Sequence, residues 1–273
     1  MPAAIRRSPT PCSASRTRPL AGADKPITLI TGASSGIGAA LARRLARHGD
    51  HVVLVARRLR LLQEVAAEIA KAGGSSEIAV CDVTIGEASR ACVEEVLRKH
   101  GRIDRLILNA GGGSRSAPEN LTGADMRASF DLNLFGVVNF VEAALPALLQ
   151  QGNGQIVAIG SIAGFRGLPH AASYGAAKAA LMNYIESLRI DLAPRGIAVT
   201  LAAPGFVVTK DTKKQRTKPM SMQVEPAADL LAKAILARRS YVSFPWTLAW
   251  IARLMRLLPP PLYDRVIRAL DRG

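Results

Sequence analysis

Tyr174 and Lys178 are the residues of this sequence whose types and spacing most directly suggest acid–base chemistry. They are four residues apart in an Ala-rich stretch, so a helix there would project both side chains from one face. A free phenol has a pKa of about 10 and exchanges protons poorly at neutral pH, whereas a nearby ammonium group stabilises the phenolate. We therefore expect Tyr174 to serve as a general acid or base, with Lys178 supplying the positive charge.

Ser161 is a third residue that fits this chemistry. It ends the run GQIVAIGS, residues 154–161, whose apolar β-branched residues predict a strand. A hydroxyl at the end of that strand can hydrogen-bond the same oxygen that Tyr174 protonates. Tyr184, on the same predicted helix as Tyr174, has no lysine four residues later and is interpreted as a packing residue.

The stretch TGASSGIG, residues 31–38, predicts a loop that binds a nucleotide phosphate. Its glycines, Gly32, Gly36 and Gly38, lie between a β-branched run and a stretch with apolar residues at helical spacing. Backbone amides at the start of a helix carry partial positive charge, and side chains at these glycines would block the approach of a pyrophosphate. The other residues of this candidate loop are Ser34, Ser35 and Ile37.

The end of the second predicted strand indicates which dinucleotide binds. An acid is expected there for a ribose 2′-hydroxyl, but the sequence has Arg57, Arg58 and Arg60, with no acid before Glu64. Guanidinium groups pair well with a 2′-phosphate, so the pattern favours NADP(H) over NAD(H), with Arg57 as the principal candidate and Arg58 beside it. The alternative is that these arginines form only a solvated helix start.

The elements that must position these residues follow an α/β pattern. Short β-branched runs alternate with longer stretches of helical periodicity. The runs are continuous rather than alternating, which is typical of parallel strands covered on both faces. The predicted strands are 27–31, 51–56, 77–83, 105–110, 154–161 and 197–204. With right-handed crossovers they form a doubly wound parallel sheet of the Rossmann type, in a single domain over residues 25–245.

The charge of the chain gives no indication of a nucleic-acid partner. The net charge is +15, but residues 26–209 hold 18 basic and 15 acidic side chains, so the excess belongs to the two ends. No zinc-finger or RNA-recognition spacing accompanies it. Residues 1–24 are rich in Pro, Ser, Ala and Arg and are interpreted as a disordered basic extension, with an organelle transit peptide as the alternative.

The cysteines predict neither a disulfide framework nor a metal site. Cys12, Cys81 and Cys92 are irregularly spaced and include no CxxC pair. Cys81 is expected to be a small buried residue in a strand. A reducing cytoplasm is the expected location.

Taken in order, these motifs resemble the short-chain dehydrogenase/reductase family over roughly residues 26–210. The matching motifs are TGxxxGIG, NAGG at 109–112, Asn133 in DLNLFG, Ser161, YGAAK at 174–178, and PG at 204–205. The resemblance implies a Rossmann-type fold and hydride transfer between a nicotinamide and a small-molecule carbonyl or alcohol. It also implies a homo-dimer or homo-tetramer, for which the Ala-rich helices predicted over 125–149 and 174–191 offer small-residue faces.

The resemblance assigns roles to further residues. Asn133 would hold a water relay linking Lys178 to solvent. The other implied cofactor contacts are Asp82 and Val83 at the adenine, Asn109, Ala110 and Gly111 at the ribose, and Pro204, Gly205, Val207 and Thr209 near the carboxamide. A cofactor-sensing or scaffold protein of the same fold is the alternative function, but it would be expected to have lost Tyr174 or Lys178.

The C-terminal segment 246–273 is the part that the resemblance explains least. Residues 246–258 include Arg253 and Arg256 and are too few to span a bilayer, which takes about 20 apolar residues. After Pro259–Pro261, a second amphipathic helix is predicted. The apolar residues at helical spacing are Trp246, Trp250, Leu254 and Leu257, then Leu262, Val266, Ile267 and Leu270.

Two roles are open for these amphipathic C-terminal helices. A lid and dimer contact over the substrate cleft is favoured, and a peripheral membrane contact is the alternative. The two can coexist if the substrate is a lipid that enters from the membrane. The second role would add membrane association to the cytoplasmic location, and it fits a loose likeness to family members that act on lipids or sterols. The basic segment 210–218 is likewise either a flexible solvated loop or a docking site for an anionic group.

Overall fold

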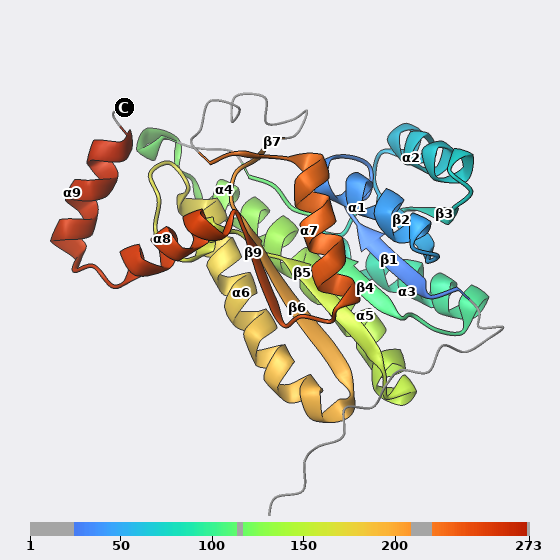
Figure 1. The fold of residues 1–273 in the computed structure, drawn as a ribbon. Helices are drawn as coiled ribbons and strands as arrows, with labels where there is room; N and C mark the ends of the chain where they lie inside the picture. The colour runs from blue at the N-terminus through green and yellow to red at the C-terminus, as the bar shows by residue number, and fades with distance from the viewer. Residues whose placement is uncertain (1–24, 114–116, 209–219, 272–273) are drawn as a thin grey trace, which may run out of the picture.

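The computed structural model of the 273-residue chain describes residues 25–113, 117–208 and 220–271. Parallel strands in this part of the chain form one sheet in the order β3-β2-β1-β4-β5-β6-β9 (Figure 1). Their bounds are β1 Ile27–Thr31, β2 His51–Ala56, β3 Ser75–Val80, β4 Arg105–Leu108, β5 Gly154–Ile159, β6 Ile197–Pro204 and β9 Tyr241–Phe244. The predicted doubly wound sheet is confirmed, and its strand order reverses between β1 and β4, where open α/β sheets bind ligands.

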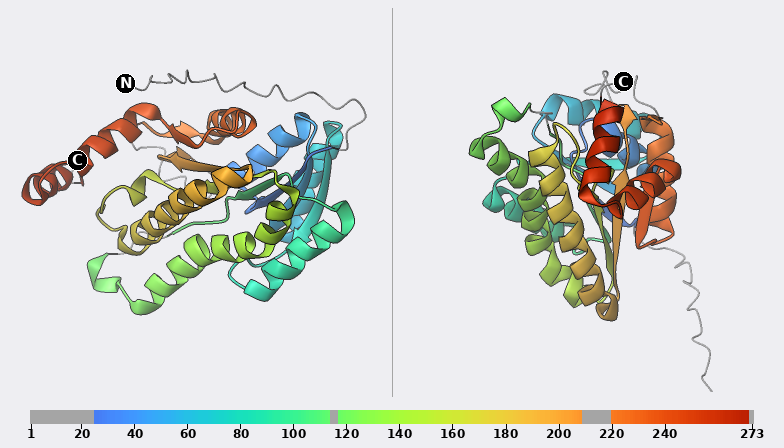
Figure 2. Two further views of the ribbon diagram at one scale, coloured as in Figure 1. Left: turned by 90° about the horizontal axis from the view of Figure 1, so that it is seen from below. Right: turned by 90° about the vertical axis from the view of Figure 1, so that its left-hand side faces the viewer.

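Helices cover both faces of the sheet (Figures 1 and 2). On one face lie α1 (Gly36–Arg47), α2 (Leu59–Lys71) and α7 (Val224–Leu236), and on the other lie α3 (Gly86–His100), α5 (Gly136–Gln151) and α6 (Ala172–Leu192). Each face has its own apolar core. Within β1, Leu29 belongs to the core beneath α5 and α6, whereas its neighbour Ile30 belongs to the core beneath α1 and α7. Burial on both faces explains the continuous apolar runs.

The strand bounds differ from the predicted ones mainly at the carboxyl ends. The strands predicted over 27–31, 51–56 and 197–204 match, whereas those predicted to end at residues 83, 110 and 161 end at Val80, Leu108 and Ile159. The excess residues leave the sheet and form loops, which is where ligand-binding groups gather in this architecture. Strand β9 and the two-residue strands β7 (Val207–Val208) and β8 (Met222–Gln223) were not predicted, because they are short.

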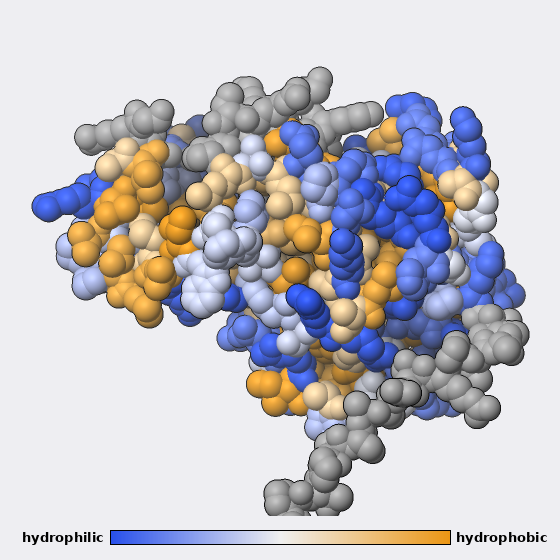
Figure 3. Space-filling view, in the orientation of Figure 1, coloured by the Kyte–Doolittle hydropathy of each residue, from blue (hydrophilic) through white to orange (hydrophobic). Residues whose placement is uncertain are grey.

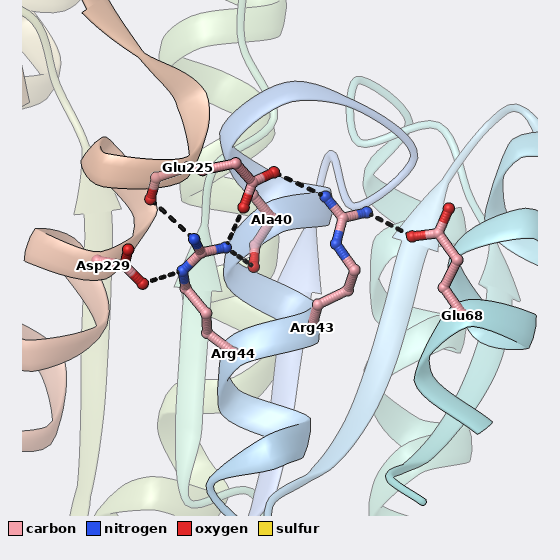
Figure 4. Close-up of polar contacts among 6 residues, drawn as sticks. All are labelled: Ala40, Arg43, Arg44, Glu68, Glu225 and Asp229. Carbon is pink, nitrogen blue, oxygen red and sulfur yellow. Dashed lines mark hydrogen bonds and ion pairs between the residues drawn. The ribbon is translucent and has the colours of Figure 1, made fainter. Parts of the chain in front are cut away.

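A cluster of ion pairs holds α7 against α1. The guanidinium group of Arg44 on α1 donates to a carboxylate oxygen of Glu225 at 2.6 Å, to the Glu225 carbonyl oxygen at 2.9 Å and to Asp229. Arg43 bridges Glu225, at 3.3 Å, and Glu68 of α2, at 2.9 Å. Figure 4 shows the two arginines side by side on α1 between these acids. The cluster fixes the start of α7 over the sheet.

Two helices are joined by a π-helical turn beside the sheet. Helix α4 (Gly123–Phe130) runs through the π turn Asp131–Phe135 into α5. Among the described residues, this stretch, Gly123–Gln151, is the one helix long and apolar enough to cross a membrane by length and composition. Phe140 and Leu148 of α5 lie in the core, so packing against the sheet explains its hydrophobicity.

The C-terminal helices α8 (Trp246–Arg256) and α9 (Pro260–Asp271) follow β9 and extend away from the sheet (Figures 1 and 2). Helix α8 rests on the body of the protein through Ala249, which is 1% exposed. The prolines were expected to end one helix before the next began after them, but α9 begins at Pro260. A proline in the first helical turn loses no hydrogen bond, because the amide there has no partner within the helix.

Candidate active site

Tyr174 and Ser161 meet at the carboxyl end of β5. Tyr174 lies in the first turn of α6, and Ser161 follows β5 as the first residue of a tight turn in which its Oγ accepts a hydrogen bond from the Ala163 amide at 3.2 Å. The Ser161 side chain lies near enough to the Tyr174 hydroxyl to lower the pKa of that group. The structure therefore brings together the two hydroxyl groups that were predicted to contact one substrate oxygen.

Lys178 lies one helical turn beyond Tyr174 and is buried. Its side chain is 4% exposed, and Nζ donates a hydrogen bond to the Ile159 carbonyl oxygen at 2.8 Å. Burial lowers the pKa of Lys178 to about 8. The Nζ atom lies 5.9 Å from the centroid of the Tyr174 ring, so the two side chains share one side of α6 as predicted.

The pKa of Tyr174 is shifted in the direction opposite to the one expected from Lys178. Burial raises the pKa of Tyr174, and the nearby Ser161 side chain opposes this only in part. The reason is that Lys178 directs Nζ toward Ile159 while the phenol is desolvated. Tyr174 is consequently protonated at neutral pH, which is the form that can give a proton to a carbonyl oxygen.

Asn133 is a fully buried residue of the π turn. Its Nδ2 donates to the carbonyl oxygens of Gly112, at 2.8 Å, and Ser129, at 2.9 Å, while its Oδ1 accepts from the Gly112 amide at 3.1 Å. A Cβ atom added to Gly111 would lie 2.9 Å from Asn133 Oδ1 and 3.0 Å from Lys178 Nζ. Asn133 and Lys178 therefore converge on the backbone of Gly111, while the water relay implied by the resemblance stays a prediction.

Gly113 is a site residue that the sequence analysis missed. A Cβ atom there would lie 2.6 Å from Cδ2 of Tyr174, so only glycine lets this backbone pass across the Tyr174 ring. The run of three glycines after Asn109 and Ala110 was the available signal. Its meaning depends on the position of Tyr174, which is far away in the sequence.

The glycine-rich turn between β1 and α1 has the shape expected of a phosphate cradle. Gly32 and Gly36 have φ angles of +68° and +56°, which favour glycine. A side chain at Gly38 would collide with the Gly32 carbonyl oxygen and with Asn109. The first turn of α1 contains no acidic residue, so the partial positive charge of its amides is available to an anion. Ile37 packs against the core and fixes this turn.

Asn109 and Ala110 brace the cradle from the end of β4. The Asn109 Nδ2 atom donates to the carbonyl oxygens of Thr31, at 3.1 Å, and Gly32, at 3.2 Å. The amides of Asn109 and Ala110 both donate to Thr31 Oγ1 at 3.0 Å. Asn109 and Ala110 therefore hold the glycine-rich loop in position, largely through Thr31. The sequence analysis did not predict this role for any of the three residues.

Two arginines border the cradle, in different ways. Arg58 donates to Ser34 Oγ at 2.9 Å and to Ser35 Oγ at 2.8 Å, so its guanidinium group lies against the glycine-rich turn. Arg57, the principal candidate for the 2′-phosphate, is 70% exposed and contacts an Asp82 carboxylate oxygen at 3.4 Å. Burial alone would raise the pKa of Asp82, but hydrogen bonds from Thr84 and the charge of Arg57 outweigh it and lower that pKa.

The glycine cradle and the donors of these serines and arginines fit a phosphate-bearing dinucleotide. The remaining predicted contacts lie around this surface. Val83 packs closely against Gly136, since a Cβ atom added to Gly136 would lie 2.7 Å from Val83 Cγ2. The Gly205 amide, just after Pro204, donates to the Phe244 carbonyl oxygen at 2.8 Å, and Val207 is buried in β7. Thr209, the basic segment 210–218 and the extension 1–24 lie outside the described residues.

A pocket of about 320 Å³ opens beside Tyr174. Leu121, Ala128 and Leu132 form apolar parts of its wall, and Asp125, Ser129 and Ser173 contribute polar groups. The backbone of Gly112 and Gly113 forms the side next to the Tyr174 ring. Apart from Tyr174 and Gly112, which belong to the YGAAK and NAGG motifs, these lining residues were not predicted, because the pocket is assembled from α4, the glycine run and the start of α6.

The fold also brings together His51, Glu77 and His100, whose candidate ligand atoms lie within 4.8 Å of one another. Glu77 already accepts a hydrogen bond from His100 Nε2 at 3.0 Å and pairs with Lys99 at 3.5 Å. His51 Nδ1 is hydrogen-bonded to Ser75 Oγ at 2.7 Å, whereas its Nε2 is buried without a hydrogen-bond partner. The cluster lies in the amino-terminal halves of β2 and β3, away from Tyr174.

Comparison with known proteins agrees with this geometry. The family described as short chain dehydrogenase matches residues 26–220. An uncharacterized oxidoreductase of Myxococcus xanthus is 38% identical over 89% of this chain and 96% of its own length. The 11-beta-hydroxysteroid dehydrogenase A of Sesamum indicum is 34% identical, over 86% of this chain and 76% of its own.

Solved structures of similar proteins contain either dinucleotide. A metagenomic short-chain oxidoreductase in complex with NADP has a TM-score of 0.69 and 33% identity, covering 80% of this chain and 94% of that one. A short-chain dehydrogenase/reductase from Burkholderia phymatum in complex with NAD has a TM-score of 0.78 and 26% identity, covering 85% of this chain and 93% of that one.

Proposed function

This chain belongs to the short-chain dehydrogenase/reductase family of oxidoreductases, and from that premise we propose that it interconverts a ketone or aldehyde and an alcohol with NADP(H), using Tyr174 as general acid and base. The observation that carries the proposal is that Tyr174 lies beside Ser161 and one helical turn before the buried Lys178. All three lie at the carboxyl end of β5, next to the pocket.

Tyr174 performs the proton transfer in this proposal. When bound, the nicotinamide supplies hydride in the reducing direction and accepts it in the oxidising direction. Because burial raises the pKa of Tyr174, its hydroxyl is protonated at neutral pH and can protonate the developing alkoxide. Ser161 Oγ stabilises the same oxygen through a hydrogen bond as negative charge develops on it.

Lys178 and Asn133 support the return of the proton to Tyr174. A lysine with a pKa near 8 exchanges protons readily at physiological pH. Asn133 is fixed by three hydrogen bonds to backbone groups, and its Oδ1 lies beside Gly111 together with Lys178 Nζ. We assign to this pair the path by which Tyr174 regains its proton after each reduction.

The substrate we propose is a hydrophobic carbonyl or alcohol of lipid or steroid character. The pocket beside Tyr174 has the apolar residues Leu121, Ala128 and Leu132 in its wall. A related protein of Sesamum indicum is named as an 11-beta-hydroxysteroid dehydrogenase, and a 36% identical one of Acinetobacter baylyi, matched over 78% of this chain, as a fatty acyl-CoA reductase. Both names denote large apolar substrates.

The experiment is a screen of carbonyls and alcohols from C4 to steroid size that follows NADPH absorbance. With the best substrate, Tyr174→Phe should lower kcat by at least about 100-fold while NADPH binding changes little, because the variant loses a proton but little contact area. The variant is compared with Tyr184→Phe, which alters a packing tyrosine of the same helix. Retention of more than a few per cent of the activity in Tyr174→Phe would contradict the proposal.

A further inference from the structure

Helix α8 has apolar side chains on two sides, and only one of them contacts the protein. On the inner side Ala249 is buried, and a Cβ atom on Gly205 would lie 2.9 Å from Leu248. The outer side carries Trp246, Trp250, Leu254 and Leu257, which are 68%, 56%, 58% and 80% exposed. We call these four residues the α8 face. Such a cluster of exposed large apolar residues marks an interaction surface.

The α8 face is held on a fixed support. Arg166, in the loop that precedes Tyr174, donates through Nη1 to the carbonyl oxygens of Met255, Arg256 and Leu258 at 2.6, 3.2 and 2.8 Å, which caps the end of α8. The same guanidinium group lies 3.8 Å from the centroid of the Tyr263 ring on α9. The hydroxyl of Tyr263 donates to the Gly167 carbonyl oxygen.

Apolar exposure continues onto α9. Leu262 and Leu270 are 47% and 71% exposed, whereas Tyr263 faces the protein and is 7% exposed. Figure 3 shows the apolar side chains gathered over the region of α8 and α9, with charged groups at their margins. The pattern is that of an amphipathic helix pair whose apolar side is not covered by the described part of the chain.

The residue types on this surface favour a lipid bilayer as its occupant. The chain contains only two tryptophans, and both are in the α8 face. Tryptophan is enriched where membranes meet water, because its ring is apolar and its N–H bonds to polar groups there. The exposed arginines Arg256 and Arg265 on the same two helices add positive charge suited to anionic headgroups. Arg253 lies against the Tyr241 ring, 4.5 Å from its centroid, and Arg268 pairs with Asp264 at 3.7 Å.

A second copy of the chain fits this surface less well. In a symmetric dimer the same patch meets itself, so the arginines of α8 and α9 would be brought against those of the partner. The chain as a whole also carries a net charge of +15. An anionic surface complements this charge. With 11 residues, α8 is also too short to span a bilayer, which takes about 20.

We propose that the α8 face inserts into the headgroup boundary of a bilayer that contains anionic lipids and holds the enzyme on its surface. Because α8 contacts Gly205 and is capped by the loop before Tyr174, the bilayer would adjoin the site. An apolar substrate could then pass from lipid to pocket, a consequence that rests on the proposed function. Membrane binding itself needs no turnover, so the two proposals fail independently.

Tryptophan emission reports directly on this proposal, because both tryptophans belong to the α8 face. The full chain is mixed with vesicles of equal parts phosphatidylglycerol and phosphatidylcholine, or of phosphatidylcholine alone, and flotation is measured in parallel. With anionic vesicles we expect emission to shift to shorter wavelength and the protein to float with the lipid. Raising the salt concentration should weaken the binding, because the charge attraction is screened.

Matched variants separate the α8 face from general basic attraction. Trp250→Ser/Leu254→Ser should bind anionic vesicles at least tenfold more weakly, whereas Ile85→Ser/Leu230→Ser, which changes two exposed apolar residues on other helices and loops, should bind as the wild type does. Turnover of a water-soluble carbonyl should be equal in both variants. Wild-type protein that ignores anionic vesicles overturns the proposal, as does a double variant that binds normally. If instead Trp250→Ser/Leu254→Ser lowers the molar mass in light scattering, the face is an interface between copies.

Discussion

Burial acts in opposite directions on the two ionisable residues of the site. It raises the pKa of Tyr174 and lowers that of Lys178 to about 8, because in each case it disfavours the charged form. The pKa of Lys178 therefore lies below that of Tyr174, and the two values move apart. An ammonium group with a pKa near 8 can return a proton to a phenolate whose pKa is higher, which favours the protonated form of Tyr174.

The pKa of Lys178 predicts how the stability of the fold depends on pH. Unfolded lysine has a pKa of about 10.4, so between pH 8 and 10.4 the unfolded chain holds a proton that the folded chain has released. The free energy of unfolding therefore rises with pH in this window, by about 2 kcal/mol between pH 7 and 9.5. Lys178→Met lacks this contribution. We expect the wild type to gain about that much relative to the variant in urea unfolding at the two pH values; a constant difference would contradict the lowered pKa.

The arginines after β2 predict the cofactor preference. If Arg57 and Arg58 bind a 2′-phosphate, Arg57→Ala and Arg58→Ala should each lower the preference for NADPH over NADH by about tenfold or more, as expected for loss of a charge-assisted contact. The matched control is Arg60→Ala, because Arg60 is 80% exposed and pairs with Glu64. Dissociation constants are measured at fixed salt. If the ratio of the dissociation constants for NADH and NADPH is the same in all three variants, this segment does not select NADP(H).

At the scale of elements, the sequence predicted the strands better than their ends. The runs at 27–31, 51–56 and 197–204 are rich in apolar and β-branched residues, and both faces of each strand are covered, so composition identifies them. Asn109, Ala110 and Ser161 were predicted within strands but lie beyond them, because hydrogen bonds to Thr31 and to the Ala163 amide replace the ladder there. Amino-acid composition alone does not reveal these hydrogen bonds.

The parts of the site that could not be predicted depend on contacts between distant residues. The π turn places Asn133 against the Gly112 backbone. The backbone of Gly113 passes across the Tyr174 ring, although Tyr174 is far away in the sequence. Arg58 contacts Ser34 and Ser35, although it lies on the next βα unit. In each case the residue type was visible in the sequence, but the partner was decided by how the elements pack.

The attachment of α8 predicts a local effect of Arg166→Met. The variant removes three hydrogen bonds to carbonyl groups at the end of α8 and the contact with the Tyr263 ring. We expect amide hydrogen exchange to accelerate in α8 and α9 and to stay unchanged in β1, β4 and β5. Arg90→Met, at an arginine 63% exposed on α3, serves as the control. Slow exchange in α8 of the Arg166 variant would show that other contacts hold the helix.

At the scale of the whole molecule, net positive charge and exposed apolar side chains are unevenly distributed along the chain. The central residues 26–209 are nearly balanced in charge, while the C-terminal part carries both the arginines and the α8 face. The residues proposed to be catalytic lie in the balanced body. A bilayer contact made through α8 and α9 would therefore leave the outer sides of α5 and α6 available for a contact between copies.

The last prediction is that the protein forms a homo-dimer or homo-tetramer through α5 and α6. Both helices expose large apolar residues, with Phe135 just before α5 at 50%, Leu149 at 37% and Ile190 on α6 at 69%. A symmetric interface buries such patches against themselves. We expect light scattering to give two or four times the chain mass of 28.9 kDa, and Ile190→Glu to lower that value because it would place like charges together in the interface. Trp250→Ser/Leu254→Ser should leave the mass unchanged, which keeps this interface distinct from the α8 face. A particle of 28.9 kDa across micromolar concentrations would refute the prediction.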